Sequence, residues 1–212
     1  MEELRKYIRK TLLAEACAGA TAMIQKGLDE IEKRDLKIEV YIDPVGDGGY
    51  DVVLMSGSGD QSLGHYHVTA SNAYTVCASF VTISTEVDSE LRNTGIGAVI
   101  YDIAIEVATK LGNYLACDRG HVSRQAKRMW SYYAASNDYE AFQLDTKDST
   151  FTPQKDDDCQ QYVFARDMGI DEEEIGRQHY EPFLSSPFTK AFRKKKITTI
   201  PCLGNRYTEV EV

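Results

Sequence analysis

The stretch that decides the fold is Val87-Asp88-Ser89-Glu90-Leu91-Arg92-Asn93-Thr94-Gly95-Ile96-Gly97. It separates a run rich in Val, Thr, Tyr and Phe from a strongly periodic apolar segment. Gly95 and Gly97 have no Cβ, so the main chain at both residues can approach an anion closely. A helix that begins here directs unpaired N–H groups and the positive end of its dipole toward that anion. The stretch therefore predicts a binding loop for a phosphate-bearing cofactor.

The segments on both sides of this loop alternate between strand and helix patterns. Alternating β-branched and aromatic residues predict strands, and a Gly/Asp/Pro cluster between the first two predicts an antiparallel hairpin. Apolar residues at helical spacing predict helices. In chain order, the predicted elements are a helix over the first thirty-odd residues, strands at 36–42 and 50–55, two strands within 65–87, a helix at 96–111 closed by Gly112, a short strand at 113–117 and a helix at 122–133 with Ser123 as N-cap.

This order places the loop between a strand and a helix that leads to a further strand. Such a helix joins parallel strands by a right-handed crossover. The fold class predicted from the pattern is therefore α/β (α+β).

Composition limits the functions that this fold can serve. The chain has 212 residues, of which 42% are hydrophobic and 27% charged, so it can bury a proper core. The net charge of −9 disfavours broad affinity for nucleic acid or anionic membranes. No apolar run approaches the roughly 20 residues that a membrane span needs, so we expect no membrane association.

The cysteines carry no pairing signal. Five of them are scattered without a CxxC pair, namely Cys17, Cys77, Cys117, Cys159 and Cys202. Together with the lack of a cleavable signal sequence, this pattern favours reduced thiols and a cytoplasmic protein.

The loop resembles the signature of the GNAT superfamily of acyl-coenzyme A N-acyltransferases, Arg/Gln-x-x-Gly-x-Gly/Ala, which here reads Arg92-Asn93-Thr94-Gly95-Ile96-Gly97. The common family run Val-x-Pro-Glu-Tyr-Arg-Gly-x-Gly-Ile-Gly aligns without gaps on residues 87–97, with Ser89 replacing proline and Asn93 replacing glycine. In element order the resemblance covers about residues 36–135. It implies a GNAT-like fold: a mixed, mostly antiparallel central sheet, splayed between strands 4 and 5, with helices on both faces.

The resemblance also implies a cosubstrate, acetyl-CoA or another acyl-coenzyme A, and a primary amine as acceptor. The family holds the coenzyme A pyrophosphate with the backbone of this loop. The residues assigned to cofactor binding in this way are Val87, Arg92, Asn93, Thr94, Gly95, Ile96, Gly97 and Ala98.

The family's second landmark, Asn-x-x-Ala-x-x-x-Tyr, is altered to Ser123-x-x-Ala126-x-x-x-Trp130. The family tyrosine can protonate the departing thiolate, which an indole N–H cannot do. Tyr132 or Tyr133 is the replacement acid, because a phenol of pKa about 10 can protonate a thiolate. The alternative for both tyrosines is core packing.

Several other side chains are candidates for catalysis or ligand binding around the expected cleft. Glu86, at the end of the fourth strand, is the candidate general base, and its alternative is a solvated carboxylate. His65 and His67 share one face of a strand, but no third ligand is in view, so we expect no metal site. At the end of the fifth strand, Asp118 and Arg119 can pair with each other, and Arg119 can instead contact the 3′-phosphate of coenzyme A.

We divide the chain into a GNAT-like domain at 1–138 and a C-terminal extension at 139–212. The apolar residues of the extension indicate docking on the core or on a second subunit, as in a homodimer. Its basic run, Arg193 to Lys196, is typical of a solvated face, and a nucleic-acid contact is the alternative.

Three functions remain open from the sequence. The first is an enzyme that transfers an acyl group directly to an amine. The second is a catalytically diverged binding or structural module, for example a phage-encoded one, since the chain is also similar to GNAT-like proteins of tailed bacteriophages. The third, an unrelated nucleotide-binding protein, lacks the P-loop Lys and the third glycine of a Rossmann fingerprint.

Overall fold

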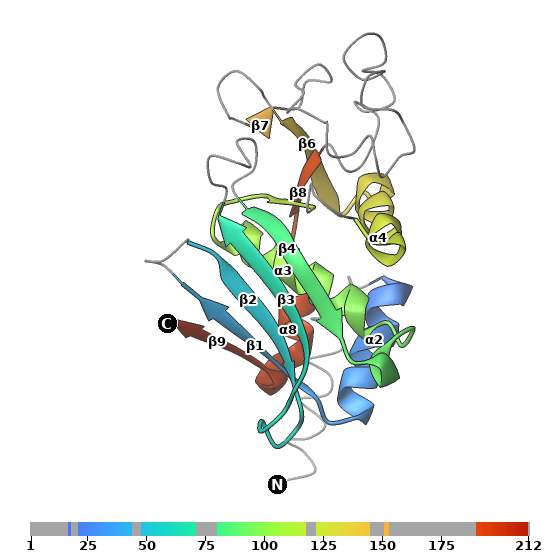
Figure 1. Cartoon of the computed structure of the whole chain (residues 1–212). Helices are drawn as coiled ribbons and strands as arrows, with labels where there is room; N and C mark the ends of the chain where they lie inside the picture. The colour runs from blue at the N-terminus through green and yellow to red at the C-terminus, as the bar shows by residue number, and fades with distance from the viewer. Residues whose placement is uncertain are drawn as a thin grey trace, which may run out of the picture.

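The computed structural model describes residue 17 and residues 21–43, 48–70, 80–117, 122–144, 151–152 and 190–211. These residues form an α+β structure (Figure 1). The helices are α2 (Ala22–Lys33), α3 (Ile96–Lys110), α4 (Arg124–Ala135) and α8 (Thr199–Leu203). The strands are β1 (Lys37–Ile42), β2 (Tyr50–Met55), β3 (Ser62–Ala70), β4 (Phe80–Val87), β5 (Leu115–Ala116), β6 (Tyr139–Leu144), β7 (Phe151–Thr152), β8 (Lys190–Lys194) and β9 (Tyr207–Glu211).

The strands pair in the order β7-β6-β8-β5-β4-β3-β2-β1-β9. On one side of the short β5 lies a mixed sheet of β4, β3, β2, β1 and β9, and on the other a small antiparallel sheet of β8, β6 and β7. Strands β1 to β4 are antiparallel neighbours, whereas β9 pairs with β1 in parallel. The sheet is therefore mixed and mostly antiparallel, as the sequence predicts.

The two faces of the mixed sheet differ in burial. One face is buried and carries alternating apolar residues such as Ile38, Val52 and Tyr66, which have no exposed surface. Helix α3 packs on this face, where the Tyr50 hydroxyl donates to the Ala104 carbonyl at 2.6 Å. Full burial of each such aliphatic side chain stabilises the fold by about 1.5–3 kcal/mol. This face is the core of the molecule.

All the described helices share this core, so the expectation of helices on both faces is wrong for the part of the chain that the structure describes. Helix α4 joins the others through Trp130, whose ring meets Tyr101 of α3 edge-on. The physical reason is that α2, α8 and α4 all pack against α3, which lies on the apolar face of the sheet.

Helix α2 packs on the beginning of α3 through two glycines. A Cβ on Gly27 would lie 2.4 Å from the Gly95 carbonyl oxygen, and a Cβ on Gly95 would lie 2.9 Å from the Gly27 nitrogen. Gly95 also adopts a left-handed conformation, with φ 97°. Both glycines are therefore required by close backbone packing between the two helices.

The C-terminal residues are part of the same sheet. Strand β9 forms its edge beside β1, and β8 lies between β5 and β6 (Figure 1). An ion pair from Arg206 to Asp35, 2.6 Å between Nη1 and Oδ1, joins this segment to the end of α2.

The secondary-structure predictions are confirmed in type and closely in position. Ser123 is the N-cap of α4 and accepts a hydrogen bond from the Ala126 amide, and Gly112 has φ 75° after α3. Leu111, predicted on the apolar stripe, is 41% exposed, because it follows the last turn of the helix. Residues 1–16 and 18–20 of the predicted first helix lie outside the described residues.

The structure pairs two of the cysteines that the sequence predicts to be reduced. Cys17 and Cys202 form a disulfide, with their Cα atoms 5.1 Å apart. The pair closes a sequence separation of 185 residues, so no local spacing could reveal it. Cys117 is buried. None of the helices in the described part of the chain is long and apolar enough to cross a membrane.

Candidate functional site

The loop before α3 is built by local hydrogen bonds. The Asp88 side chain accepts from the Glu90 amide at 3.0 Å and opens a short 3-10 turn at Ser89–Leu91. The Thr94 hydroxyl then donates to the Leu91 carbonyl at 2.6 Å. Asn93, at φ 63°, and Gly95 both adopt left-handed conformations, which turn the chain sharply into α3.

This turn leaves several main-chain donors open. The amides of Asn93, Thr94, Gly95 and Gly97 donate to no acceptor among the described residues, and none of these residues is fully buried. By contrast, the Ala98 amide donates to the Gly95 carbonyl at 3.0 Å. Unpaired amides at a helix N-terminus are the usual donors for an anion.

Gly97 differs from Gly95 in what surrounds it. A Cβ on Gly97 would meet no atom within 4 Å. Glycine lowers the stability of a helix by up to about 1 kcal/mol relative to alanine. Within the described residues no packing contact requires Gly97, so its small size has no internal explanation.

Two positive side chains lie at the same loop. Arg92 is exposed, and its Nε donates to the Val87 carbonyl at 3.3 Å. Lys26 of α2 donates from Nζ to the Asn93 carbonyl at 3.1 Å. The sequence analysis missed Lys26, because only the packing of α2 on α3 brings it to the loop.

Strand β4 pairs in parallel with the two-residue strand β5, Phe80 with Leu115 and Val81 with Ala116. Beyond Val81, β4 has no β5 partner within the described residues. The pairing of β4 with β3 also shifts between His67 and Val68, which gives β4 an extra residue between Thr82 and Ser84. Such a bulge changes the direction of the side chains that follow it and is over-represented next to active sites.

Two phenols lie beside this part of β4: the Tyr66 hydroxyl is 2.6 Å from Thr82 Oγ1, and Tyr101 lies beside Thr85. The Thr85 hydroxyl donates to the Tyr101 hydroxyl at 3.3 Å, so the phenol's own proton is left without an acceptor in the described residues. The ring also contacts Tyr66 of β3 and Trp130 of α4, both edge-on. Burial raises the pKa of Tyr101 above its usual 10.0. Nothing in the sequence pattern distinguishes Tyr101, because it lies within the apolar run of α3.

The two tyrosines selected from the sequence lie in an aromatic cluster away from solvent. Tyr133 is buried against Trp130, Tyr139 and Phe192, and Tyr132 packs beside it. Neither hydroxyl has a partner among the described residues. Burial raises the pKa of Tyr133 well above its usual 10.0. No ring contact or hydrogen bond joins Tyr132 or Tyr133 to the loop at 92–98 within the described part of the chain.

Glu86 is exposed near the end of β4, directly opposite His65 in the β3–β4 register. His65 and Glu86 therefore share the open face, whereas Thr85 points to the α3 side. Asp118, Arg119 and His121 lie outside the described residues.

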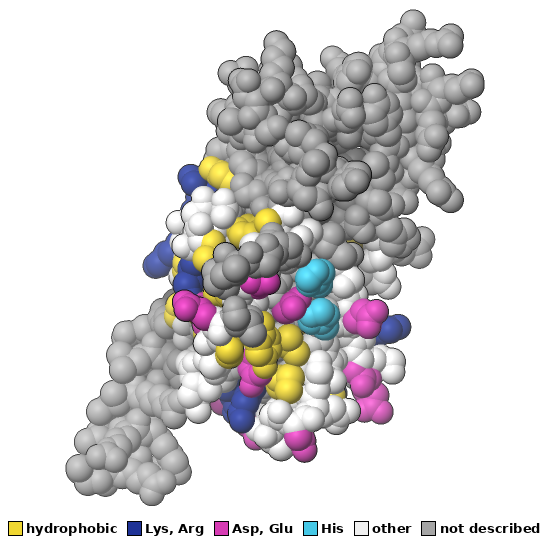
Figure 2. Space-filling model, turned by 60° about the vertical axis from the view of Figure 1, so that its left-hand side comes forward, with side chains coloured by type: hydrophobic (Ala, Val, Ile, Leu, Met, Phe, Trp, Pro, Cys, Tyr) yellow, Lys and Arg dark blue, Asp and Glu magenta, His cyan; other side chains and the backbone are white. Residues whose placement is uncertain are grey.

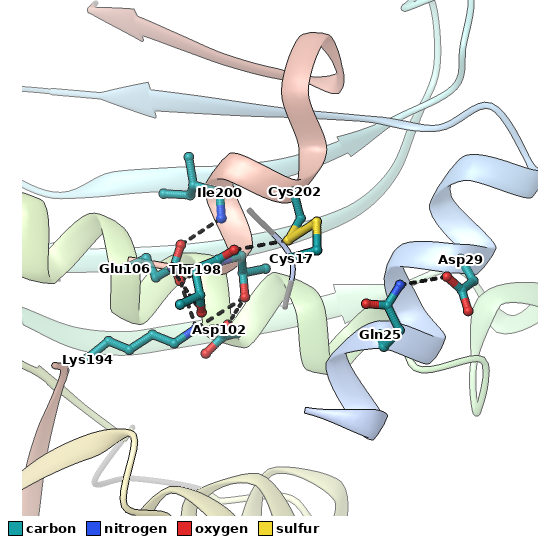
Figure 3. Close-up of a disulfide and its surroundings, with 10 residues drawn as sticks. Cys17, Gln25, Asp29, Asp102, Glu106, Lys194, Thr198, Ile200 and Cys202 are labelled. Carbon is teal, nitrogen blue, oxygen red and sulfur yellow. Dashed lines mark hydrogen bonds and ion pairs between the residues drawn. A yellow bond between two sulfur atoms is a disulfide. The ribbon is translucent and has the colours of Figure 1, made fainter. Parts of the chain in front are cut away.

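A second polar cluster lies in the middle of α3 and is fully enclosed (Figure 3). Lys194 Nζ lies 2.6 Å from Asp102 Oδ2 and 2.7 Å from Glu106 Oε1. Backbone amides of Thr198, Thr199 and Ile200 donate to Glu106 at 2.6, 2.7 and 2.7 Å. The Tyr139 hydroxyl donates to Asp102 Oδ1.

This cluster changes the interpretation of the basic run at 193–196. Lys194 is buried inside the protein, and Arg193 pairs with Glu140 at 2.5 Å. Within the basic run, Lys195 and Lys196 are the two cations that form no ion pair with the described residues. The run is therefore a weaker candidate for a nucleic-acid contact. The sequence contained a signal for this cluster, namely two acidic residues inside an otherwise apolar helix. Buried carboxylates are almost always paired, so a buried cation was to be expected beside them.

Comparisons of the chain with protein-family models, with curated protein sequences and with solved structures found no match.

Proposed function

We propose that the protein is an N-acyltransferase that transfers an acyl group, with acetyl-CoA as the expected donor, to a primary amine. The loop at 92–98 would hold the pyrophosphate of coenzyme A. The observation that carries the proposal is the set of open amides at Asn93, Thr94, Gly95 and Gly97, beside a glycine whose missing side chain serves no internal contact.

Two further features support this assignment. Arg92 and Lys26 supply positive charge beside the amides, which favours a diphosphate over a neutral ligand. Beyond Val81, the backbone of β4 has no strand partner on the β5 side within the described residues. An extended pantetheine arm with its amides suits such an edge.

In the proposed reaction the amine nitrogen attacks the thioester carbonyl, forming the C–N bond and breaking the C–S bond. Tyr101 gives its proton to the departing thiolate, and its position at Thr85 makes it a better candidate than Tyr132 or Tyr133. Glu86 accepts the proton of the amine from the open side of β4. Tyr101 reaches β4 from the α3 side, whereas Glu86 lies on its open side. The amine and the thioester therefore approach from opposite sides of β4.

The test compares two substitutions at Gly97. Gly97→Ala adds a methyl group into open space and should bind acetyl-CoA with an affinity reduced less than threefold. Gly97→Trp covers the open amides and should reduce the affinity at least tenfold. Calorimetric titration with acetyl-CoA measures both, and urea unfolding controls for stability. Absence of binding to the unmodified chain at millimolar acetyl-CoA would refute the proposal.

A catalytically diverged binding module is the second candidate, because the family's tyrosine position is occupied by Trp130, which is 1% exposed and part of the core. It predicts acetyl-CoA binding without turnover. Mass spectrometry with polyamines, amino acids, aminoglycosides and protein lysines as acceptors distinguishes the two. If the protein is an enzyme, at least one of these acceptors gains the mass of one acyl group.

A further inference from the structure

The open face of the mixed sheet carries a cluster of metal-ligand side chains from two neighbouring strands. His67 Nδ1 lies 2.6 Å and His65 Nε2 2.9 Å from the same oxygen, Oδ1 of Asp51. The ligand atoms of the three residues all lie within 4.8 Å of one another. Figure 2 shows the two histidines side by side on this face with acidic side chains nearby.

The strand register brings these residues together. His65 and His67 are two apart on β3 and so point to the same face. Asp51 of β2 is the direct cross-strand partner of His67. The pairing of the two rings, with centroids 6.0 Å apart and nearly parallel planes, keeps both histidines beside the carboxylate. The sequence analysis expected no metal because the third ligand lies 14 residues before His65 in another strand.

We propose that Asp51, His65 and His67 bind a divalent transition-metal ion, with Zn²⁺ as the expected ion. Two imidazoles and a carboxylate are a donor set that suits zinc. Tetrahedral coordination with bonds of about 2.0–2.2 Å places ligand atoms roughly 3.3 Å apart. To admit the ion, the two oxygen–nitrogen distances of 2.6 and 2.9 Å have to lengthen by a few tenths of an ångström. The two imidazole nitrogens, which lie within 4.8 Å of each other, have to adjust to the same spacing.

The site would have an open coordination position. The three side chains are about one-third to two-fifths exposed, so solvent reaches the ion. Three protein ligands and a water molecule are the arrangement of zinc sites that bind or activate a ligand, whereas structural sites are closed by four protein ligands. Ser84 and Glu86 lie opposite His67 and His65 on β4 and border this open position.

The alternative is an ion-free carboxylate that accepts hydrogen bonds from two histidines. It predicts no affinity for metals beyond that of any surface histidine pair. The two cases differ in the stoichiometry and the geometry of metal binding. They also differ in whether metal binding depends on Asp51, because binding to an isolated histidine pair would not.

The experiment titrates the full metal-free chain with Zn²⁺ by calorimetry and with Co²⁺ by visible absorption. We expect one equivalent of each ion to bind, with the intense d–d bands of four-coordinate Co²⁺. His67→Gln and Asp51→Asn should each weaken binding at least tenfold and remove these bands. A matched control, the exposed Glu211→Gln on β9, should leave both the affinity and the bands unchanged.

Two outcomes would overturn the proposal: Zn²⁺ affinity no stronger than millimolar in the unmodified chain, or an affinity that Asp51→Asn leaves unchanged. Far-UV circular dichroism of each variant checks folding. The site is independent of the coenzyme A loop, so acetyl-CoA binding should be the same in His67→Gln and in the unmodified chain. Failure of either proposal is therefore distinguishable from failure of the other.

Discussion

The middle and the beginning of helix α3 differ in how their polar groups are satisfied. Around Asp102 and Glu106, the carboxylates are buried and receive hydrogen bonds from Lys194, a tyrosine, a threonine hydroxyl and backbone amides. At the beginning of the helix, by contrast, the amides of Asn93, Thr94, Gly95 and Gly97 have no acceptor in the described part of the chain, and Arg92 reaches solvent.

The difference separates a structural cluster from a candidate site. A buried charge is tolerated only when it is paired and hydrogen-bonded, so the Lys194 cluster is explained by folding alone. It joins α3 to the C-terminal strands and leaves no oxygen of Glu106 free for a ligand. Open donors on an accessible helix end are instead satisfied by water or by a ligand.

The largest expected effect is on the buried cluster. Lys194→Met leaves two carboxylates buried without their cation and should lower the free energy of unfolding by about 3–5 kcal/mol. Lys195→Met, on the exposed neighbour, should change it by less than about 0.5 kcal/mol. Urea unfolding at pH 7 measures both, and equal effects would show that the cluster has no special role.

The pH dependence of this cluster follows from Lys194. Burial alone lowers the pKa of a lysine, but attraction to Asp102 and Glu106 outweighs it and raises the pKa of Lys194 above its usual 10.5. The stabilisation is therefore fully present below pH 10.5 and is lost as the pH rises through the higher pKa of the folded state. The difference between Lys194→Met and the unmodified protein should stay constant from pH 7 to 10.

The next largest effect concerns the proposed acid. If Tyr101 protonates the thiolate, Tyr101→Phe should lower kcat about 100-fold or more and leave the KM for acetyl-CoA within about twofold. Tyr132→Phe is the control and should keep kcat within about threefold. Steady-state kinetics with the best acceptor measures both. A larger loss in Tyr132→Phe than in Tyr101→Phe would reverse the assignment.

A smaller effect is expected where α2 meets the loop. Gly27→Ala should destabilise the protein by about 1–3 kcal/mol, although alanine favours helices, because its Cβ would overlap the Gly95 carbonyl and Val99 Cγ2. Gly97→Ala should be neutral or stabilising by up to about 1 kcal/mol. Thermal unfolding that ranks these variants the other way would contradict the packing described for α2.

The smallest effect belongs to an exposed ion pair that also joins α3 to the C-terminal segment. Lys110 pairs with Glu209, and the two side chains are 40% and 33% exposed. Glu209→Gln should cost less than about 1 kcal/mol and less still at high salt. Urea unfolding at low and high salt measures this.

Lowering the pH should remove the stabilisation that the Lys110–Glu209 ion pair provides. Partial burial raises the pKa of Glu209, but hydrogen bonds from Lys110 and Tyr207 outweigh it, and the pKa lies below its usual 4.5. The stabilisation is present above pH 4.5 and is lost as the pH falls through the lower folded value. A Glu209→Gln effect that persists at pH 2 would point to a contact other than the ion pair.

Local structure was largely predictable because it depends on neighbours in the sequence. Period-2 and period-3.6 patterns placed β1, β2 and α3 within a residue or two, and Ser123 signalled the start of α4. The candidate loop was found for the same reason, since its turn residues and the helix that follows are contiguous.

Contacts between distant segments were not predictable in this way. Lys194 lies 92 residues from Asp102, and the pairing of Cys17 with Cys202 spans 185 residues. Asp51 joins the histidines only because the β2–β3 register sets it beside His67. None of these pairs leaves a periodic signal, so each required the fold.

By itself, the sequence determined the strands, the helices and a glycine-rich turn with donors for an anion, because backbone preferences and apolar periodicity act over a few residues. Only the tertiary structure decided which polar groups are satisfied. It buried Lys194 against α3, set Gly27 of α2 against Gly95, and left Gly97 and the open face around Asp51 accessible. Burial and hydrogen-bond satisfaction depend on what packs across space, and that is fixed when the sheet and helices assemble.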